Sequence, residues 1–115
     1  MEDLIIIKVN TDGAANGSPG QSGSGGIFRD SNGVFVACFA SYLYIQDVLF
    51  AEMSLAMKAI SMSSKRGWMN LWLKCDSTLV VDIFNGKSNA PWKLQNKWLI
   101  CKRKIVHMNF SVSHI

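Results

Sequence analysis

Apolar residues change their spacing along this chain of 115 residues, and that change most constrains the fold. Up to about residue 41, apolar side chains run together or alternate with polar ones, as in buried and half-buried strands. From Asp47 onward they follow helical spacing, at Val48, Ala51, Leu55, Ala59 and Met62. Strand-like and helix-like segments then alternate. Strands separated by helices run parallel to a neighbour, so we predict one α/β domain with a mixed sheet.

The expected elements follow the order β-β-β-α-β-α-α-β over a single domain, residues 1–115. A first strand at 4–10 runs on to Asp12, and a glycine-rich loop is expected at 13–26. Strands at 26–29 and 34–41 are joined by an Asp-Ser-Asn-Gly turn, which is typical of a hairpin and predicts an antiparallel meander. The prediction then continues with a helix from 47 to 66 and a strand at 71–75. It ends with a short helix capped by Ser77 or Thr78, a helix after Pro91 and a strand at 107–113.

Composition and short motifs exclude several classes of protein. Hydrophobic residues make up 49% and charged residues 17%, which excludes a disordered chain. No apolar run spans a bilayer and no secretion signal is recognised, so we expect an intracellular protein, nuclear or cytoplasmic, without a membrane partner. Cys38, Cys75 and Cys101 fit no zinc or redox spacing and are expected to be reduced, buried thiols. The glycine-rich loop lacks a P-loop ending, and no small-molecule cofactor is expected.

The charged residues are unevenly distributed. All eight acids precede residue 83, whereas residues 84–115 hold no acid and six bases: Lys87, Lys93, Lys97, Lys102, Arg103 and Lys104. A basic segment favours a polyanion such as a nucleic acid, because binding releases counterions from the phosphates. The alternative is a solvated helix face.

Three carboxylates are expected at one edge of the sheet. Asp12 closes the first strand and Asp76 closes the fourth, so both emerge at the carboxyl edge if those strands are parallel neighbours. Glu52 borders the helix face that packs on the sheet. Converging carboxylates repel one another unless a divalent ion neutralises them, and oxygen ligands favour magnesium or manganese. Such a paired-metal site suits phosphodiester hydrolysis.

Each acid also has a structural alternative. Asp12 with the following glycine forms an Asx turn, Glu52 faces solvent on its helix, and Asp76 caps the next helix. The convergence of all three on one expected edge favours the metal-site hypothesis. No serine or cysteine has a histidine and an acid beside it in the expected fold, so a nucleophilic triad is not indicated.

Several motifs occur in a specific order: Asn-Thr-Asp-Gly-Ala-Ala at 10–15, Gly-Ser-Pro-Gly at 17–20, Gly-Ser-Gly-Gly-Ile at 23–27, Arg-Asp-Ser-Asn-Gly at 29–33, Ala-Glu at 51–52 and Cys-Asp-Ser at 75–77. Through them the sequence resembles the ribonuclease H family, and more narrowly plant ribonuclease H-like domains related to retroelements. The resemblance runs from about Val9 to the last residue. It implies a ribonuclease H-like fold with a mixed five-stranded sheet flanked by helices. It also implies a magnesium-dependent, two-metal endonuclease that cleaves the RNA strand of RNA–DNA hybrids.

The resemblance also implies roles for individual residues. Asp12, Glu52 and Asp76 match metal-binding catalytic carboxylates, and His114 matches a histidine that helps to release product. The residues expected to contact the hybrid are Gly13, Ala14, Ala15, Ser18, Ser77, Lys97, Lys102 and Arg103. Contacts near the 2′-hydroxyls distinguish RNA from DNA.

The sequence departs from the family's pattern in three respects. Ser18 stands where the family usually has asparagine. Val48 and Leu49 stand where a polar pair often precedes the helical glutamate. The family's fourth acid and last helix come after the histidine, whereas this sequence stops at Ile115, so we expect the C-terminal helix to be missing and apolar sheet surface to be exposed. Two alternatives to an active hydrolase follow: a catalytically impaired hybrid-binding module, and a non-functional retroelement remnant.

Overall fold

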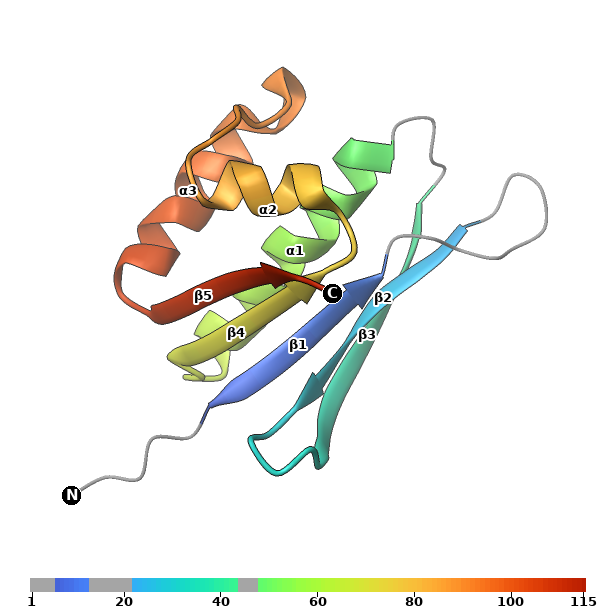
Figure 1. Cartoon of the computed structure of the whole chain (residues 1–115), viewed down its shortest axis with the longest axis vertical. Helices are drawn as coiled ribbons and strands as arrows, with labels where there is room; N and C mark the ends of the chain where they lie inside the picture. Colours follow the sequence, from blue (N-terminus) through green and yellow to red (C-terminus); the bar gives the residue numbers. More distant parts are fainter. Residues whose placement is uncertain (1–5, 13–21, 44–47) are drawn as a thin grey trace.

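A computed structural model describes residues 6–12, 22–43 and 48–115, except for the side chains of residues 12, 22–24, 41–43 and 48. Its elements appear in the predicted order (Figure 1). They are β1 (Ile7–Asp12), β2 (Ser22–Arg29), β3 (Phe35–Leu43), α1 (Val48–Lys65), β4 (Asn70–Cys75), α2 (Thr78–Phe84), a 3-10 turn η1 (Trp92–Leu94), α3 (Gln95–Val106) and β5 (Asn109–His114).

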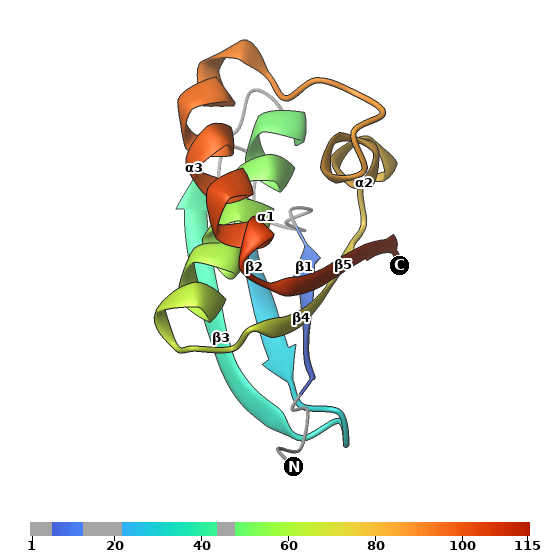
Figure 2. The same ribbon diagram turned by 90° about the vertical axis from the view of Figure 1, so that its left-hand side faces the viewer.

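The strands form a mixed five-stranded sheet in the order β3-β2-β1-β4-β5. The pairs β1–β2 and β2–β3 are antiparallel, which confirms the predicted meander. The pairs β1–β4 and β4–β5 are parallel, because helices connect these strands. Helices α1, α2 and α3 all lie on one face of the sheet (Figures 1 and 2). The carboxyl ends of β1, β4 and β5 therefore meet at one edge.

The core lies between the sheet and these helices. Alternate residues of β1 and β4 point to it, and the side chains of Val9 and Leu73 are fully buried. The predicted apolar residues Ala51, Leu55 and Ala59 of α1 are buried as well. Several further α1 residues are buried because the helix contacts the sheet on one side and α2 and α3 on others: Met53, Ala56, Met57 and Ile60. None of the helices in the described ranges has the length and apolarity needed to cross a membrane.

Strand β2 begins at Ser22, so the loop predicted for residues 13–26 is wrong over its last five residues. Glycines in this part of β2 do not form a turn. They allow the neighbouring strand to approach closely. A Cβ atom on Gly25 would lie 2.3 Å from the backbone oxygen of Phe39, and one on Gly26 would lie 2.5 Å from the Phe39 ring. These two glycines let β3 and its aromatic side chain pack directly on β2.

The hairpin between β2 and β3 has the turn that its sequence predicts. Asp30 Oδ1 accepts hydrogen bonds from the backbone N–H groups of Asn32 and Val34, both at 2.9 Å. Gly33 adopts a φ of +80°, which suits glycine. The end of α1 is also as predicted, because Gly67 follows it with a φ of +73°.

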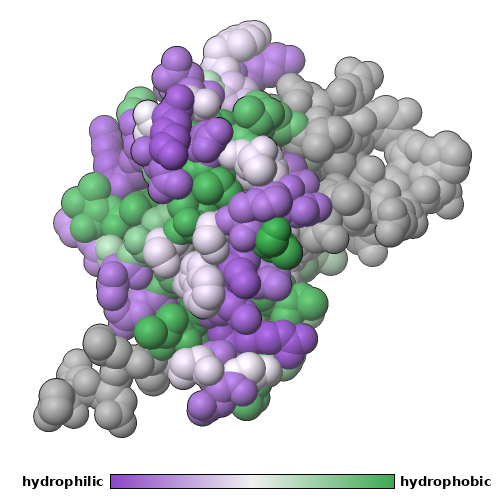
Figure 3. Space-filling model, in the orientation of Figure 1, coloured by the Kyte–Doolittle hydropathy of each residue, from purple (hydrophilic) through white to green (hydrophobic). Residues whose placement is uncertain are grey.

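No element within the described residues covers the other face of the sheet, and apolar side chains are exposed there as expected: Ile27 of β2 and Trp72 of β4. Cys38 is also exposed on the β2–β3 half, and basic and polar residues surround Trp72 on the half formed by β1, β4 and β5: Lys8, Asn10, Lys74 and Ser111. The predicted burial is therefore wrong for Cys38, although all three cysteines are free thiols and Cys75 and Cys101 are buried. On the view that shows α2 and β5, hydrophobic residues form small groups between hydrophilic ones (Figure 3).

Candidate active site

Three parallel strand ends bring the predicted site positions together. Thr11 of β1 pairs with Cys75 of β4, so Asp12 and Asp76 directly follow two paired residues. His114 of β5 pairs with Cys75 on its other side. The backbone of Asp12, Asp76 and His114 thus lies at one carboxyl edge, across neighbouring strands that are about 4.8 Å apart.

Glu52 reaches this edge from α1. Its side chain is only 4% exposed, and its Oε2 accepts a hydrogen bond from Cys75 Sγ at 3.9 Å. The alternative of a solvent-facing glutamate is therefore wrong. The spacing on the helix explains the difference: Glu52 stands next to buried Ala51 and three residues before buried Leu55.

Asp76 is exposed and does not cap α2. The N-cap is Ser77, whose extended backbone places its Oγ to accept a hydrogen bond from the N–H of Val80 at 3.2 Å. The alternative for Asp76 is therefore wrong, and the predicted cap at Ser77 is confirmed. Because the Ser77 side chain already accepts a hydrogen bond from the first turn of α2, the Asp76 carboxylate is not needed as a helix cap.

Cys75 lies between the strand ends and Glu52. Burial raises the pKa of its thiol, and hydrogen bonds with the Ser77 backbone and the Thr11 side chain lower the pKa without reversing this effect. The carboxylates of Glu52 and Asp76 raise the pKa by smaller amounts. The group is therefore a neutral thiol that donates to Glu52, rather than a thiolate ligand or nucleophile.

The donor chemistry of this edge fits a hard divalent cation. Glu52 and Asp76 offer carboxylate oxygens, and the sequence supplies a third carboxylate at Asp12, whose side chain lies outside the described part. Among the side chains that are described, no three His, Cys, Asp or Glu residues form a group that would hold a metal ion.

The predicted substrate contacts are distributed over several regions. Gly13, Ala14, Ala15 and Ser18 lie outside the described residues. Lys97 and Lys102 line different cavities, one between α1 and α3 and the other beside α2, and Arg103 is exposed on α3. The basic residues of α3 do not therefore form one surface.

Trp92 is a candidate binding residue that was not among our predicted sites. The residue is 79% exposed at the start of η1, and the Lys93 ammonium lies 5.7 Å from the centre of the tryptophan ring. An exposed tryptophan beside a lysine suits the stacking of a nucleic-acid base. The Pro-Trp-Lys sequence in a basic segment was the available signal.

Comparisons with known proteins give a consistent result. A family model described as "Reverse transcriptase-like" matches residues 10–115. RNase H1 from the halophilic archaeon Halobacterium salinarum superposes with a TM-score of 0.77 at 22% identity, over 95% of this chain and 84% of that one. The N-terminal RNase H domain of Rv2228c from Mycobacterium tuberculosis gives 0.78 at 16% identity, over 96% and 82%. LC11-RNase H1, solved in complex with an RNA/DNA hybrid, gives 0.76 at 22% identity, over 95% and 84%.

The structural similarity shows that this is a ribonuclease H-like fold, as the sequence predicted. No curated protein matches the sequence.

Proposed function

The chain belongs to the reverse transcriptase-like family of ribonuclease H-like domains, and on that premise we propose that it hydrolyses the RNA strand of RNA–DNA hybrids with divalent metal ions. One observation carries the proposal: the ends of β1 and β4 bring Asp12 and Asp76 to one edge, where Glu52 is buried against Cys75. The hybrid bound in the LC11-RNase H1 structure supports this class of substrate.

Asp12, Glu52 and Asp76 would hold Mg²⁺, with Mn²⁺ as the other suitable ion. Bound there, a pair of ions supplies an activated water and neutralises the leaving oxygen in an in-line displacement. Glu52 suits this role because its carboxylate is almost shielded from bulk water and is oriented by the Cys75 thiol. Asp76 is exposed, which leaves it accessible to a scissile phosphate.

Two neighbouring side chains have roles that their positions support. Ser77 Oγ accepts from the N–H of Val80, so its own O–H remains free to donate to a 2′-hydroxyl of the RNA strand. His114 is exposed beside Cys75, where its imidazole can hold or transfer a proton during product release. The backbone of residues 13–15, with Ser18, provides further contacts to the hybrid.

The basic residues hold the substrate outside the reacting centre. Lys97, Lys102 and Arg103 contact phosphates, and Trp92 provides a stacking surface. Lys102 is positioned by its own tryptophan, since its ammonium lies 5.7 Å from the centre of the Trp98 ring. These contacts add affinity without reading sequence.

Cleavage of an end-labelled RNA–DNA hybrid with and without Mg²⁺ tests the proposal. We expect Asp12→Asn to lower the cleavage rate by more than about 100-fold. Replacing a residue that only orients a metal ligand costs about 10- to 100-fold in activity, and replacing the ligand itself should cost more. Asp30→Asn is the matched control. It changes the same functional group in the β2–β3 turn, and the asparagine Oδ1 can still accept both backbone hydrogen bonds there.

Two outcomes would contradict the proposal. Equal cleavage by wild type and Asp12→Asn would exclude metal chemistry at this edge. Folded protein that binds the hybrid without cleaving it would instead favour the non-catalytic binding module.

A further inference from the structure

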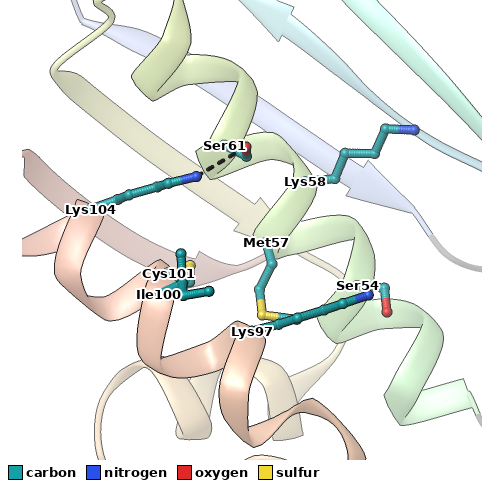
Figure 4. A pocket seen from close by; sticks show the side chains of 8 residues that line it. All are labelled: Ser54, Met57, Lys58, Ser61, Lys97, Ile100, Cys101 and Lys104. Atoms are coloured by element: carbon teal, nitrogen blue, oxygen red, sulfur yellow. Dashed lines mark hydrogen bonds between the residues drawn. The ribbon is translucent and has the colours of Figure 1, made fainter.

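A basic groove runs between α1 and α3, on the helical side of the molecule (Figure 4). Its volume is about 350 Å³. Three lysines and two serines line it: Lys58, Lys97, Lys104, Ser54 and Ser61. We call these five residues and the space between them the α1–α3 groove.

The polar residues of the groove repeat along both helices. Ser54 and Ser61 are seven residues apart on α1, and Lys97 and Lys104 are seven apart on α3. Lys104 Nζ donates to Ser61 Oγ at 3.2 Å, and the Lys97 side chain points toward Ser54 (Figure 4). Seven residues span about 10 Å at 1.5 Å per residue, so Lys97 and Lys104 are attached about 10 Å apart along α3.

Positive charge dominates the described residues that line the groove. Helices α1 and α3 together hold six bases and one acid, Glu52, which is buried against Cys75. No carboxylate in the described part of the chain pairs with any of the three groove lysines. Lys58 extends toward β3, where its ammonium lies 5.3 Å from the centre of the Phe39 ring. Within the described part of the chain, the charged groups that the groove presents to a ligand are therefore all positive.

The floor of the groove is apolar. Met57 and Cys101 are buried beneath the lysines. Burial raises the pKa of the Cys101 thiol to about 12, against the opposing effect of Lys104, so this thiol carries no charge at neutral pH. An apolar floor lowers the local dielectric constant and strengthens the attraction of the ammonium groups for an anion.

We propose that the α1–α3 groove, which includes the hybrid contact Lys97 of the proposed function, also binds the phosphate backbone of a nucleic-acid strand without the metal-binding edge. Lys97 and Lys104 are attached about 10 Å apart, which is farther than a single phosphate group can bridge, whereas a strand carries a phosphate at every nucleotide. A single phosphate ion therefore reaches only one of the two lysines. The choice of ligand follows from the spacing of the lysines as well as from their charge, and this contact requires neither metal nor cleavage.

Binding of a short fluorescein-labelled DNA duplex in EDTA, followed by anisotropy over a salt series, tests this site apart from hydrolysis. In the variant Lys97→Gln/Lys104→Gln, we expect affinity at low salt to fall on the order of tenfold. The slope of log K against log salt should decrease by about 1.8, which corresponds to two lost phosphate contacts. Lys97→Arg/Lys104→Arg should retain the wild-type slope.

The matched control is Lys65→Gln/Lys87→Gln, which removes the same charge outside the groove and should leave the slope unchanged. Circular dichroism confirms that each variant is folded. Three results would overturn the proposal: no binding by folded wild type, equal losses in the groove and control variants, or displacement by inorganic phosphate beyond that caused by KCl of equal ionic strength. The last would mean that one phosphate fills the groove. A loss of hybrid cleavage without a loss of duplex binding would contradict the proposed hydrolysis but not the groove proposal, because the two are measured separately.

Discussion

The carboxyl edge of the sheet and the α1–α3 groove are two regions that would meet nucleic-acid phosphates with opposite charge. At the edge, Asp12 ends β1, Asp76 follows β4, and Glu52 is 4% exposed. In the groove, the ligand would meet the ammonium groups of long, flexible lysine side chains, with two serine hydroxyls beside them. Phosphate is repelled at the edge until a cation is bound, whereas it is attracted directly at the groove.

This difference in charge and rigidity shows that holding a metal ion in a fixed place and attracting a phosphate require different side chains. A carboxylate fixed by a strand end or by burial holds an ion in a defined place, as hydrolysis requires. A surface lysine gains little from any single geometry and is screened by salt, but it attracts phosphate without a metal. The two regions should therefore respond differently to metal, alkaline pH and local packing.

Metal removal should have the largest effect, and on one region only. In EDTA we expect hybrid cleavage to be abolished, since the edge carboxylates then repel the scissile phosphate. Binding of a DNA duplex through the groove should remain within about twofold at constant ionic strength. Parallel cleavage and anisotropy measurements on one sample check both. Duplex binding that disappears together with cleavage would show that a single metal-dependent site serves both purposes.

Most of the edge was predictable from the sequence because its positions are set by strand ends. Asp12 and Asp76 each follow an apolar strand-like segment, and parallel pairing of those strands is enough to bring them together. Periodicity alone left Glu52 ambiguous, since it borders the apolar face of α1. Its burial became clear only from the packing of α1 against the sheet and the two other helices.

The groove was not predictable in the same way, because it depends on how two helices pack. Lys104 and Ser61 are 43 residues apart, and nothing in either helix indicates their register. The extent of β2 was missed for a similar reason. The glycine content of this segment predicted a loop, yet Gly25 and Gly26 accommodate Phe39 from the adjacent strand. Tertiary contacts override local sequence preference at such positions.

Alkaline pH should lower the free energy of unfolding through the buried thiol of Cys101 beneath the groove. The pKa of Cys101 is about 12 in the folded protein, against an ordinary value of 9.0. Above pH 9 the unfolded chain loses this proton first, so the free energy of unfolding should fall by about 1.4 kcal/mol per pH unit until the folded thiol titrates. The stability that Cys101 contributes is thus fully present below pH 9 and lost toward pH 12.

Urea unfolding of wild type and Cys101→Ala between about pH 8 and pH 10.5 measures this slope. The variant should start from a lower stability, because a small cavity is created, but it should lose stability less steeply. Cys38→Ala is the control, since Cys38 is exposed on β3. Identical slopes in wild type and Cys101→Ala would contradict the assignment.

The smallest expected effect lies beside the edge, at the cap of α2. Ser77→Ala removes the oxygen that accepts from the N–H of Val80, and a lost N-cap costs about 1 kcal/mol of unfolding free energy. Urea unfolding checks this value, and Ser77→Thr should retain most of the wild-type stability because threonine keeps the oxygen. Duplex binding in EDTA should not change, since α2 contributes no residue to the groove. A parallel fall in stability and duplex binding would mean that the edge and the groove are coupled through the helical layer, and that they are not independent regions.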